Sequence, residues 1–150
     1  MKFLFPFLSV LLGVQTFAQE RVTFVSSDSL RITADLYLNH TQDPFIILFH
    51  EAESSRGEYL KIAPKLKNLG YNCLAVDLRS GLKSSYVKNE TAARAKEKGY
   101  SLKFLDSKKD MLAAIEYAKR YNRKPIILFG SSYSASLSLI LFARKLNKIP

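Results

Sequence analysis

The sequence has little cysteine, little histidine and only one long apolar run. Its single cysteine, Cys73, excludes an intramolecular disulfide, and it lies in the apolar stretch Cys73-Leu74-Ala75-Val76, where a buried, inert thiol is expected. Beyond the N-terminus, no apolar segment approaches the roughly 20 residues that a membrane-spanning helix needs. We therefore expect one soluble domain, residues 19–150, with no stable membrane span.

The N-terminal 18 residues have the features of a secretory signal peptide. Lys2 is followed by an apolar stretch over residues 3–14 and then by Thr16-Phe17-Ala18, which supplies small residues at the −3 and −1 positions. We predict cleavage after Ala18 and export to the periplasm or the cell exterior. Pro6 and the shortness of the run argue against a membrane span, and an uncleaved N-terminal anchor is the alternative.

The net charge of +10 raises the question of a nucleic-acid partner. The basic residues are scattered along helix-like stretches, for example Lys61, Lys65 and Lys67, and no nucleic-acid-binding motif accompanies them. Solvated helix faces explain this pattern, so we predict no nucleic-acid partner.

Apolar periodicity predicts an α/β domain. Residues 22–25 and 30–38 should form an antiparallel hairpin, with the second strand buried on one face only, at Leu30, Ile32, Ala34, Leu36 and Leu38. Continuous apolar runs at 45–49, 72–76 and 125–129 predict strands buried on both faces. Helices are expected at about 59–66, 91–98, 106–121 and 135–146; Gly70 ends the first, and Met111, Leu112, Ile115 and Ala118 face inward from the third. This alternation predicts a mostly parallel sheet with flanking helices.

The most specific motif is Gly130-Ser131-Ser132-Tyr133-Ser134, between a predicted strand and a predicted helix. A nucleophile elbow, G-x-S-x-G, lies at this position in hydrolases, and its strained turn needs small residues at both ends. Gly130 meets that requirement, and Ser134 replaces the second glycine. We predict that Ser132 is a nucleophile; the alternative is a serine-rich helix cap.

A serine nucleophile needs backbone N–H donors for the oxyanion of its tetrahedral intermediate. The residue after the nucleophile, Tyr133, supplies one of them. The second should come from the loop after the strand 45–49, where Ala52 is our first choice and Glu51 our second. His50 in this loop is expected to shape it rather than to act as a base, because the hydrolase chain order puts the catalytic histidine last.

Four segments together carry a family resemblance: His50 to Tyr59, Asp77 to Gly81, Leu105 to Asp110, and the elbow. On these residues the chain resembles the α/β-hydrolase superfamily, nearest to its dienelactone-hydrolase and esterase-like members, over residues 21–150. The resemblance implies hydrolysis of a small ester or a related carbonyl compound through an acyl-enzyme on Ser132, without cofactor or metal. Esterases, lactonases, thioesterases and peptidases share this elbow, so the motif does not determine which type of bond is hydrolysed. The sequence does not determine the oligomeric state either.

Polar residues of the same segments, Asp77, Arg79 and Asp110, are expected to be architectural. They should satisfy loop backbone and helix ends.

The acid and base of a catalytic triad are missing, because no Asp, Glu or His follows Ser132. The five predicted strands are also fewer than the roughly eight that the resemblance implies. The first hypothesis is therefore the front portion of a serine hydrolase, inactive as it stands, whose acid and base lie beyond Pro150. The second is an exported, non-catalytic binding or remnant protein with a partial hydrolase fold. In the third hypothesis, the present chain is itself catalytic and His50 serves as the base.

Overall fold

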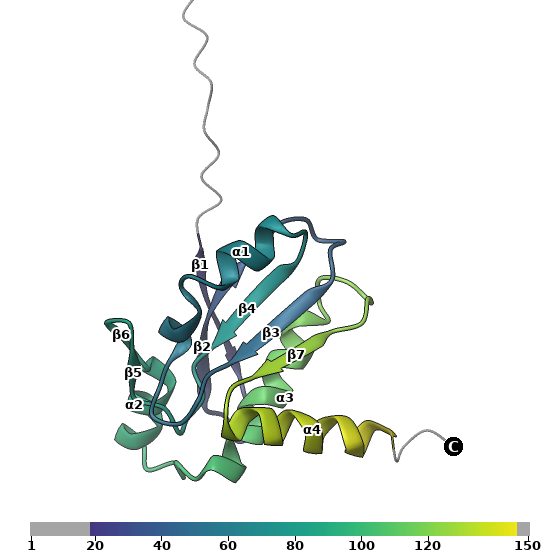
Figure 1. The fold of residues 1–150 in the computed structure, drawn as a ribbon. Coiled ribbons are helices and arrows are strands. Elements are labelled where there is room, and N and C mark those ends of the chain that lie inside the picture. The colour runs from purple at the N-terminus through teal and green to yellow at the C-terminus, as the bar shows by residue number, and fades with distance from the viewer. Residues whose placement is uncertain (1–18, 147–150) are drawn as a thin grey trace, which may run out of the picture.

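The structure, a computed structural model, describes residues 19–146. This part of the chain begins with an antiparallel hairpin (Figure 1). The predicted signal peptide, residues 1–18, lies outside the described residues. Strand β1 (Glu20–Val25) pairs with β2 (Arg31–Tyr37), with Val22 opposite Ala34. Ser29 in the connecting turn has a φ of 66°. The predicted hairpin is confirmed.

Five strands form one mixed sheet in the order β1-β2-β4-β3-β7. The three strands β4 (Asn72–Val76), β3 (Phe45–Phe49) and β7 (Ile127–Gly130) run parallel, and β2 pairs antiparallel with β4. The predicted α/β class and the five predicted strands are confirmed. A short ribbon of β5 (Lys83–Ser84) and β6 (Val87–Lys88) lies apart from this sheet and was not predicted.

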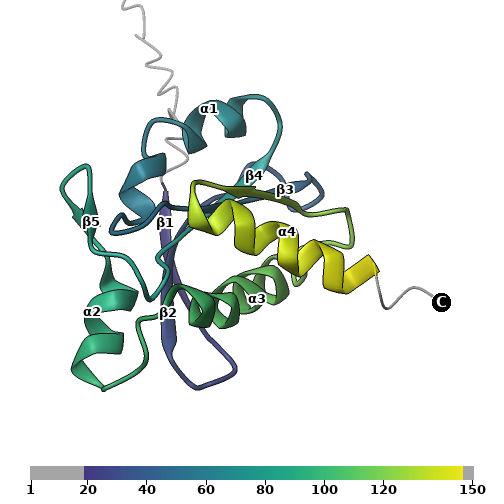
Figure 2. The ribbon, with the colours of Figure 1, turned by 60° about the horizontal axis from the view of Figure 1, so that its bottom comes forward.

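Helices cover both faces of the sheet (Figure 2). One face carries the 3₁₀ helix η1 (Arg56–Tyr59) and α1 (Ala63–Asn68), whose Tyr59 and Ala63 pack on Leu48 and Ala75. The other face carries α2 (Glu90–Glu97), α3 (Ser107–Ala118) and α4 (Tyr133–Leu146), preceded by the 3₁₀ helix η2 (Phe104–Asp106). The buried side chains on this second face include Ile47, Phe49, Leu74, Val76, Ala95, Met111, Ala114, Leu137 and Leu141.

Strand β2 is buried on both faces, which corrects the prediction of one exposed face. Thr33, Asp35 and Tyr37, the residues expected to face solvent, are 0%, 0% and 4% exposed. Tyr37 packs in the cluster around α1, and Asp35 forms an ion pair with the buried Arg56. The second face is therefore covered partly by polar side chains, which an apolar pattern does not reveal.

The inner face of α3 is also rotated from its predicted position. Leu112, expected to face inward, is 48% exposed, whereas Met111, Ala114 and Ala118 are buried. The buried face includes Asp110, which pairs with Arg79, so an ion pair replaces an apolar side chain on that face.

Strand β7 is only partly buried, although burial on both faces was predicted. Ile127 and Phe129 are 45% and 46% exposed. Within the described residues β7 has one neighbour, β3, and α4 covers only the face that carries Leu128.

The described helices are all too short or too polar to cross a membrane.

Candidate active site

Ser132 lies in the sharp turn between β7 and α4, and its side chain is exposed. Its φ is 55°, in the left-handed region that a residue with a Cβ adopts at a cost. The turn is fixed by hydrogen bonds from Ser134 N–H to Ser131 O and from Ala135 N–H to Ser132 O, at 3.3 and 3.1 Å. This strand-to-helix turn with a strained, exposed serine is the local geometry of a nucleophile elbow.

Both flanks of the turn are tightly packed. A Cβ added to Gly130 would lie 2.5 Å from both the Cα and the N atom of Ala135, so this position accepts only glycine without a backbone shift. At the other end, the Ser134 hydroxyl is buried, accepts a hydrogen bond from Ser131 N–H at 2.9 Å and donates to Phe49 O at 2.7 Å. Ser134 therefore ties the elbow to β3, which a glycine could not do.

The loop after β3 lies beside this turn at the carboxyl edge of the sheet. Phe49 at the end of β3 pairs with Gly130 at the end of β7, and Ser131 N–H donates to Phe49 O at 3.1 Å. The chain leaves β3 toward α1 on one face and leaves β7 toward α4 on the other. In open α/β sheets, ligands bind in the crevice at such a topological switch point.

The two predicted oxyanion donors belong to these adjacent segments. Tyr133 is the first residue of α4, and the first N–H groups of a helix have no partner within the helix. In the other loop, the Glu51 N–H donates to the Glu58 carboxylate at 3.0 Å. That N–H is therefore engaged, and the Ala52 N–H stays the predicted second donor.

His50 is fully buried, and both of its ring nitrogens are engaged. Leu78 N–H donates to its Nε2 at 2.9 Å, and Nδ1 lies 2.6 Å from Glu51 O. Burial lowers the pKa of the imidazole, and the bond to Glu51 O opposes that shift only in part. No nitrogen of His50 is left to take a proton from Ser132.

His40 lies at the opposite edge of the sheet. Its carbonyl accepts a hydrogen bond from the side chain of Asn72, which begins β4, whereas Ser132 follows the carboxyl end of β7. The five residues of β3 separate these edges by roughly 16 Å. Neither histidine of the sequence can therefore be a base for Ser132.

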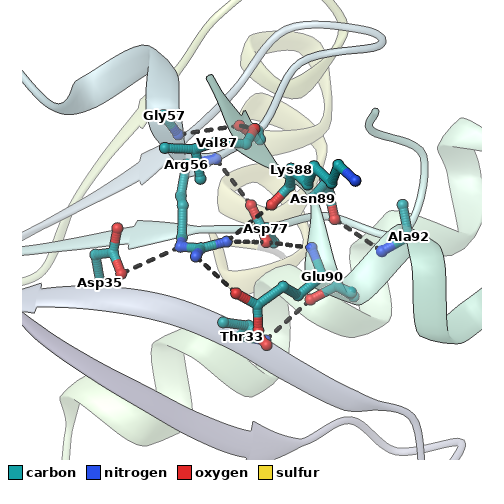
Figure 3. A network of polar contacts seen from close by, with 12 residues as sticks. Thr33, Asp35, Arg56, Gly57, Asp77, Val87, Lys88, Asn89, Glu90 and Ala92 are labelled. Carbon is teal, nitrogen blue, oxygen red and sulfur yellow. Dashed lines mark hydrogen bonds and ion pairs between the residues drawn. The ribbon is translucent and has the colours of Figure 1, made fainter. Parts of the chain in front are cut away.

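A buried arginine supports the loops of this edge (Figure 3). The Arg56 guanidinium lies between three carboxylates: Asp35 on β2 at 3.1 Å, Asp77 after β4 at 2.6 Å, and Glu90 at the start of α2 at 2.9 Å. Arg56, Asp35 and Asp77 are buried, whereas the Glu90 side chain is 36% exposed and also pairs with Arg21 at the surface. Sequence reasoning gave Arg56 no role, because Asp35 alternates with apolar residues in β2 as a solvent-facing side chain would.

A second buried arginine, Arg79, binds Asp110 on α3 and Asp28 in the hairpin turn, each at 2.7 Å. The hydrogen bond from Arg79 holds the pKa of Asp28 well below its ordinary value. These contacts agree with the architectural role expected for Asp77, Arg79 and Asp110.

Phe104 and Leu105 of η2 form an exposed apolar rim, and Phe104 contacts Tyr133, the residue after the predicted nucleophile. The Phe104 ring lies against the Tyr133 ring with centroids 4.5 Å apart, and Tyr133 Oη is 2.6 Å from Ser80 Oγ. Phe104 and its neighbour Leu105 are 48% and 63% exposed. Sequence reasoning missed this rim.

Among the described residues, no group of three or more His, Cys, Asp or Glu side chains is placed to hold a metal ion.

Comparison with solved structures shows that the chain has the fold of α/β hydrolases. An esterase from Pyrococcus furiosus matches with a TM-score of 0.60 and 22% identity, over 89% of this chain and 49% of that one. An α/β hydrolase from a Penicillium species matches with a TM-score of 0.64 and 19% identity, over 82% and 40%. The thioesterase domain from the curacin biosynthetic pathway matches with a TM-score of 0.62 and 20% identity, over 88% and 44%.

The chain thus spans less than half the length of each of these proteins. No protein-family model and no curated protein matches its sequence. The nearer resemblance to dienelactone hydrolases stays a prediction.

Proposed function

We propose that the protein is an exported serine hydrolase that cleaves a small ester or a related carbonyl compound through an acyl-enzyme on Ser132. The observation that carries the proposal is the exposed Ser132 at a φ of 55°, between β7 and α4 and next to the loop after β3. The same turn with an ordinary backbone conformation would be a helix cap, and it would need no strained residue.

The reaction follows from this placement. Ser132 Oγ attacks the carbonyl carbon while its proton passes to a histidine base, and the carbonyl oxygen becomes an oxyanion bound by the N–H groups of Ala52 and Tyr133. Collapse of the tetrahedral intermediate breaks the bond to the leaving group, which takes the proton from the histidine. Water then attacks the acyl-enzyme by the same route and frees Ser132.

By this proposal, the histidine base is supplied from outside these 150 residues. The sequence has two histidines, His40 at the wrong edge of the sheet and His50 with both nitrogens engaged. A serine hydroxyl without its base is a poor nucleophile, and removing the triad histidine costs on the order of 10⁶ in turnover. By this proposal residues 1–150 alone are inactive, and they become the nucleophile half of a working site once a histidine is supplied.

The apolar rim supports a substrate with an apolar group. Phe104 and its neighbour Leu105 are exposed, and the Phe104 ring lies against Tyr133, whose N–H would bind the oxyanion. Apolar surface next to a reacting carbonyl favours an alkyl or aryl group over a charged one. The esterase and the thioesterase among the matched structures act, by their names, on bonds of this class.

A second candidate is an exported, non-catalytic binding protein. It is favoured by the exposed apolar residues Ile127 and Phe129 on β7. Exposed apolar surface of this kind is typical of a surface that meets another molecule or segment.

Turnover of p-nitrophenyl esters of increasing acyl length distinguishes the two candidates. The protein isolated from its source should hydrolyse them, Ser132→Ala should remove essentially all turnover, and Ser136→Ala, an exposed serine one turn into α4, should leave turnover unchanged. Equal turnover in the protein and in Ser132→Ala would reject the nucleophile. A folded native protein that turns over no ester would favour the binding protein.

A further inference from the structure

We propose that His50 is a positioning residue that aims the Ala52 N–H into the site by holding the carbonyl of the same peptide unit. The inference rests on the proposed function, in which that N–H stabilises the oxyanion. It concerns a side chain that touches neither substrate nor Ser132 and that acts through the backbone of its own loop.

The protonation state of the ring follows from its contacts. Leu78 N–H donates to Nε2 at 2.9 Å, and the Asn89 side-chain amide lies 3.1 Å from the same atom. Since Nε2 is an acceptor, a neutral ring carries its hydrogen on Nδ1. Nδ1 lies 2.6 Å from Glu51 O, so it donates to that carbonyl.

Peptide geometry turns this bond into control of Ala52. The Glu51 carbonyl and the Ala52 N–H belong to one planar trans unit and point in opposite directions. A donor that fixes the carbonyl on the buried side therefore fixes the N–H on the other side. Ser54 N–H, 3.4 Å from the same oxygen, closes the turn, and Glu53 between them has a φ of 57°.

The ring itself has no freedom to rotate. His50 is fully buried, and a Cβ on Gly81 would lie 2.7 Å from its Cε1 atom. The Asn89 amide that contacts Nε2 also donates to Leu78 O at 2.9 Å, and the Asn89 side-chain oxygen caps α2 at Ala92 N–H. His50 thereby couples the predicted oxyanion loop after β3 to the loop after β4.

Two substitutions separate the two ends of the ring. In His50→Asn, the side-chain amide N–H lies where Nδ1 was and can donate to Glu51 O, but the contact with Leu78 N–H is lost. In His50→Gln, the side-chain oxygen lies where Nε2 was and can accept from Leu78 N–H, but the donor to Glu51 O is lost. The pair is matched in size and polarity, so a general effect of losing the imidazole appears in both.

The first experiment is NMR on the ¹⁵N-labelled protein. Ring nitrogen shifts should give the Nδ1–H form of His50 at neutral pH. The residual dipolar coupling of the Ala52 N–H bond should be similar in the protein and in His50→Asn and should change in His50→Gln. An Nε2–H ring in the unsubstituted protein overturns the proposal even if a variant does not fold, and so does an Ala52 coupling that His50→Gln leaves unchanged.

The second experiment measures ester turnover in the native protein. His50→Gln should lose kcat by roughly 10²–10³, the effect of removing one oxyanion donor, with KM nearly constant, and His50→Asn should retain more of it. If Ser132→Ala leaves turnover unchanged, the proposed function fails and the dipolar couplings still decide the role of His50. If turnover needs Ser132 and His50→Gln keeps full kcat, the positioning role alone is overturned.

Discussion

Glycine at position 132 should stabilise the protein relative to alanine, which is the reverse of the usual order. The reason is the φ of 55° at Ser132. A residue with a Cβ pays about 1–2 kcal/mol for the left-handed conformation, and glycine pays nothing. Glycine also makes the unfolded chain more flexible, which costs roughly 0.4–1 kcal/mol. The balance favours Ser132→Gly over Ser132→Ala by about 0.5–1 kcal/mol.

Ser136 provides the matched control for this comparison. It is an exposed serine inside α4, where ordinary helical backbone is required. At position 136 the alanine variant should be more stable than the glycine variant by about 1 kcal/mol, because glycine is a poor helix former. The difference in stability between the glycine and alanine variants should therefore have opposite signs at the two positions, and the two differences together should span about 1.5–2 kcal/mol.

Urea unfolding followed by circular dichroism measures the four variants. With a slope of about 1–3 kcal/mol per molar urea, a difference of 1 kcal/mol moves the midpoint by roughly 0.3–1 M. If glycine is less stable than alanine at position 132, as it should be at position 136, then the turn is not strained and the argument for a nucleophile elbow loses its main support.

Three further predictions concern stability and reactivity. Arg56→Ala should lower the free energy of unfolding by about 3–5 kcal/mol, because it removes the guanidinium that pairs with the buried carboxylates of Asp35 and Asp77. Lys119→Ala, in an exposed pair, should change it little, and equal urea midpoints would contradict this. Because burial lowers the pKa of His50, the unfolded chain binds a proton first as the pH falls below about 6.5, and stability should drop by up to about 1.4 kcal/mol per pH unit. His50→Gln should remove that part of the pH dependence in urea titrations at pH 7 and 5, and an identical dependence in both proteins would refute it. Burial raises the pKa of Cys73 to about 12, so a thiol reagent at pH 8 should label it only after denaturation; rapid labelling of the folded protein would place it at the surface.

The order and type of the main elements could be predicted because each has a local apolar pattern. The continuous runs at β3 and β4 and the helical spacing in α1 and α3 reflect what packs on each face. The errors have a common cause in contacts between distant segments. The second face of β2 is buried by Arg56, which lies about twenty residues further along the chain, and Asp110 takes an inner position on α3 because Arg79 pairs with it.

In the candidate site, too, local features could be predicted from the sequence and contacts between distant segments could not. The turn between β7 and α4 could be predicted because its glycine and serines are close in sequence and lie between a strand and a helix, and the role of Ser132 there stays a prediction. The engagement of His50 could not be predicted, since it depends on Leu78 N–H and Asn89 from other parts of the chain. The apolar rim was missed because Phe104 and Leu105 have no periodic pattern, and Phe104 contacts Tyr133 across a separation of 29 residues in the sequence.

The central claim is that Ser132 is an active nucleophile in the native protein. A fluorophosphonate probe forms a covalent bond only with a serine that its surroundings activate, so we would treat the protein isolated from its source and map the adduct by peptide mass spectrometry. The account predicts one adduct, on Ser132, that is lost when the protein is heat-denatured before labelling. An unlabelled Ser132 in folded protein, alongside other serine hydrolases that react in the same extract, would contradict it.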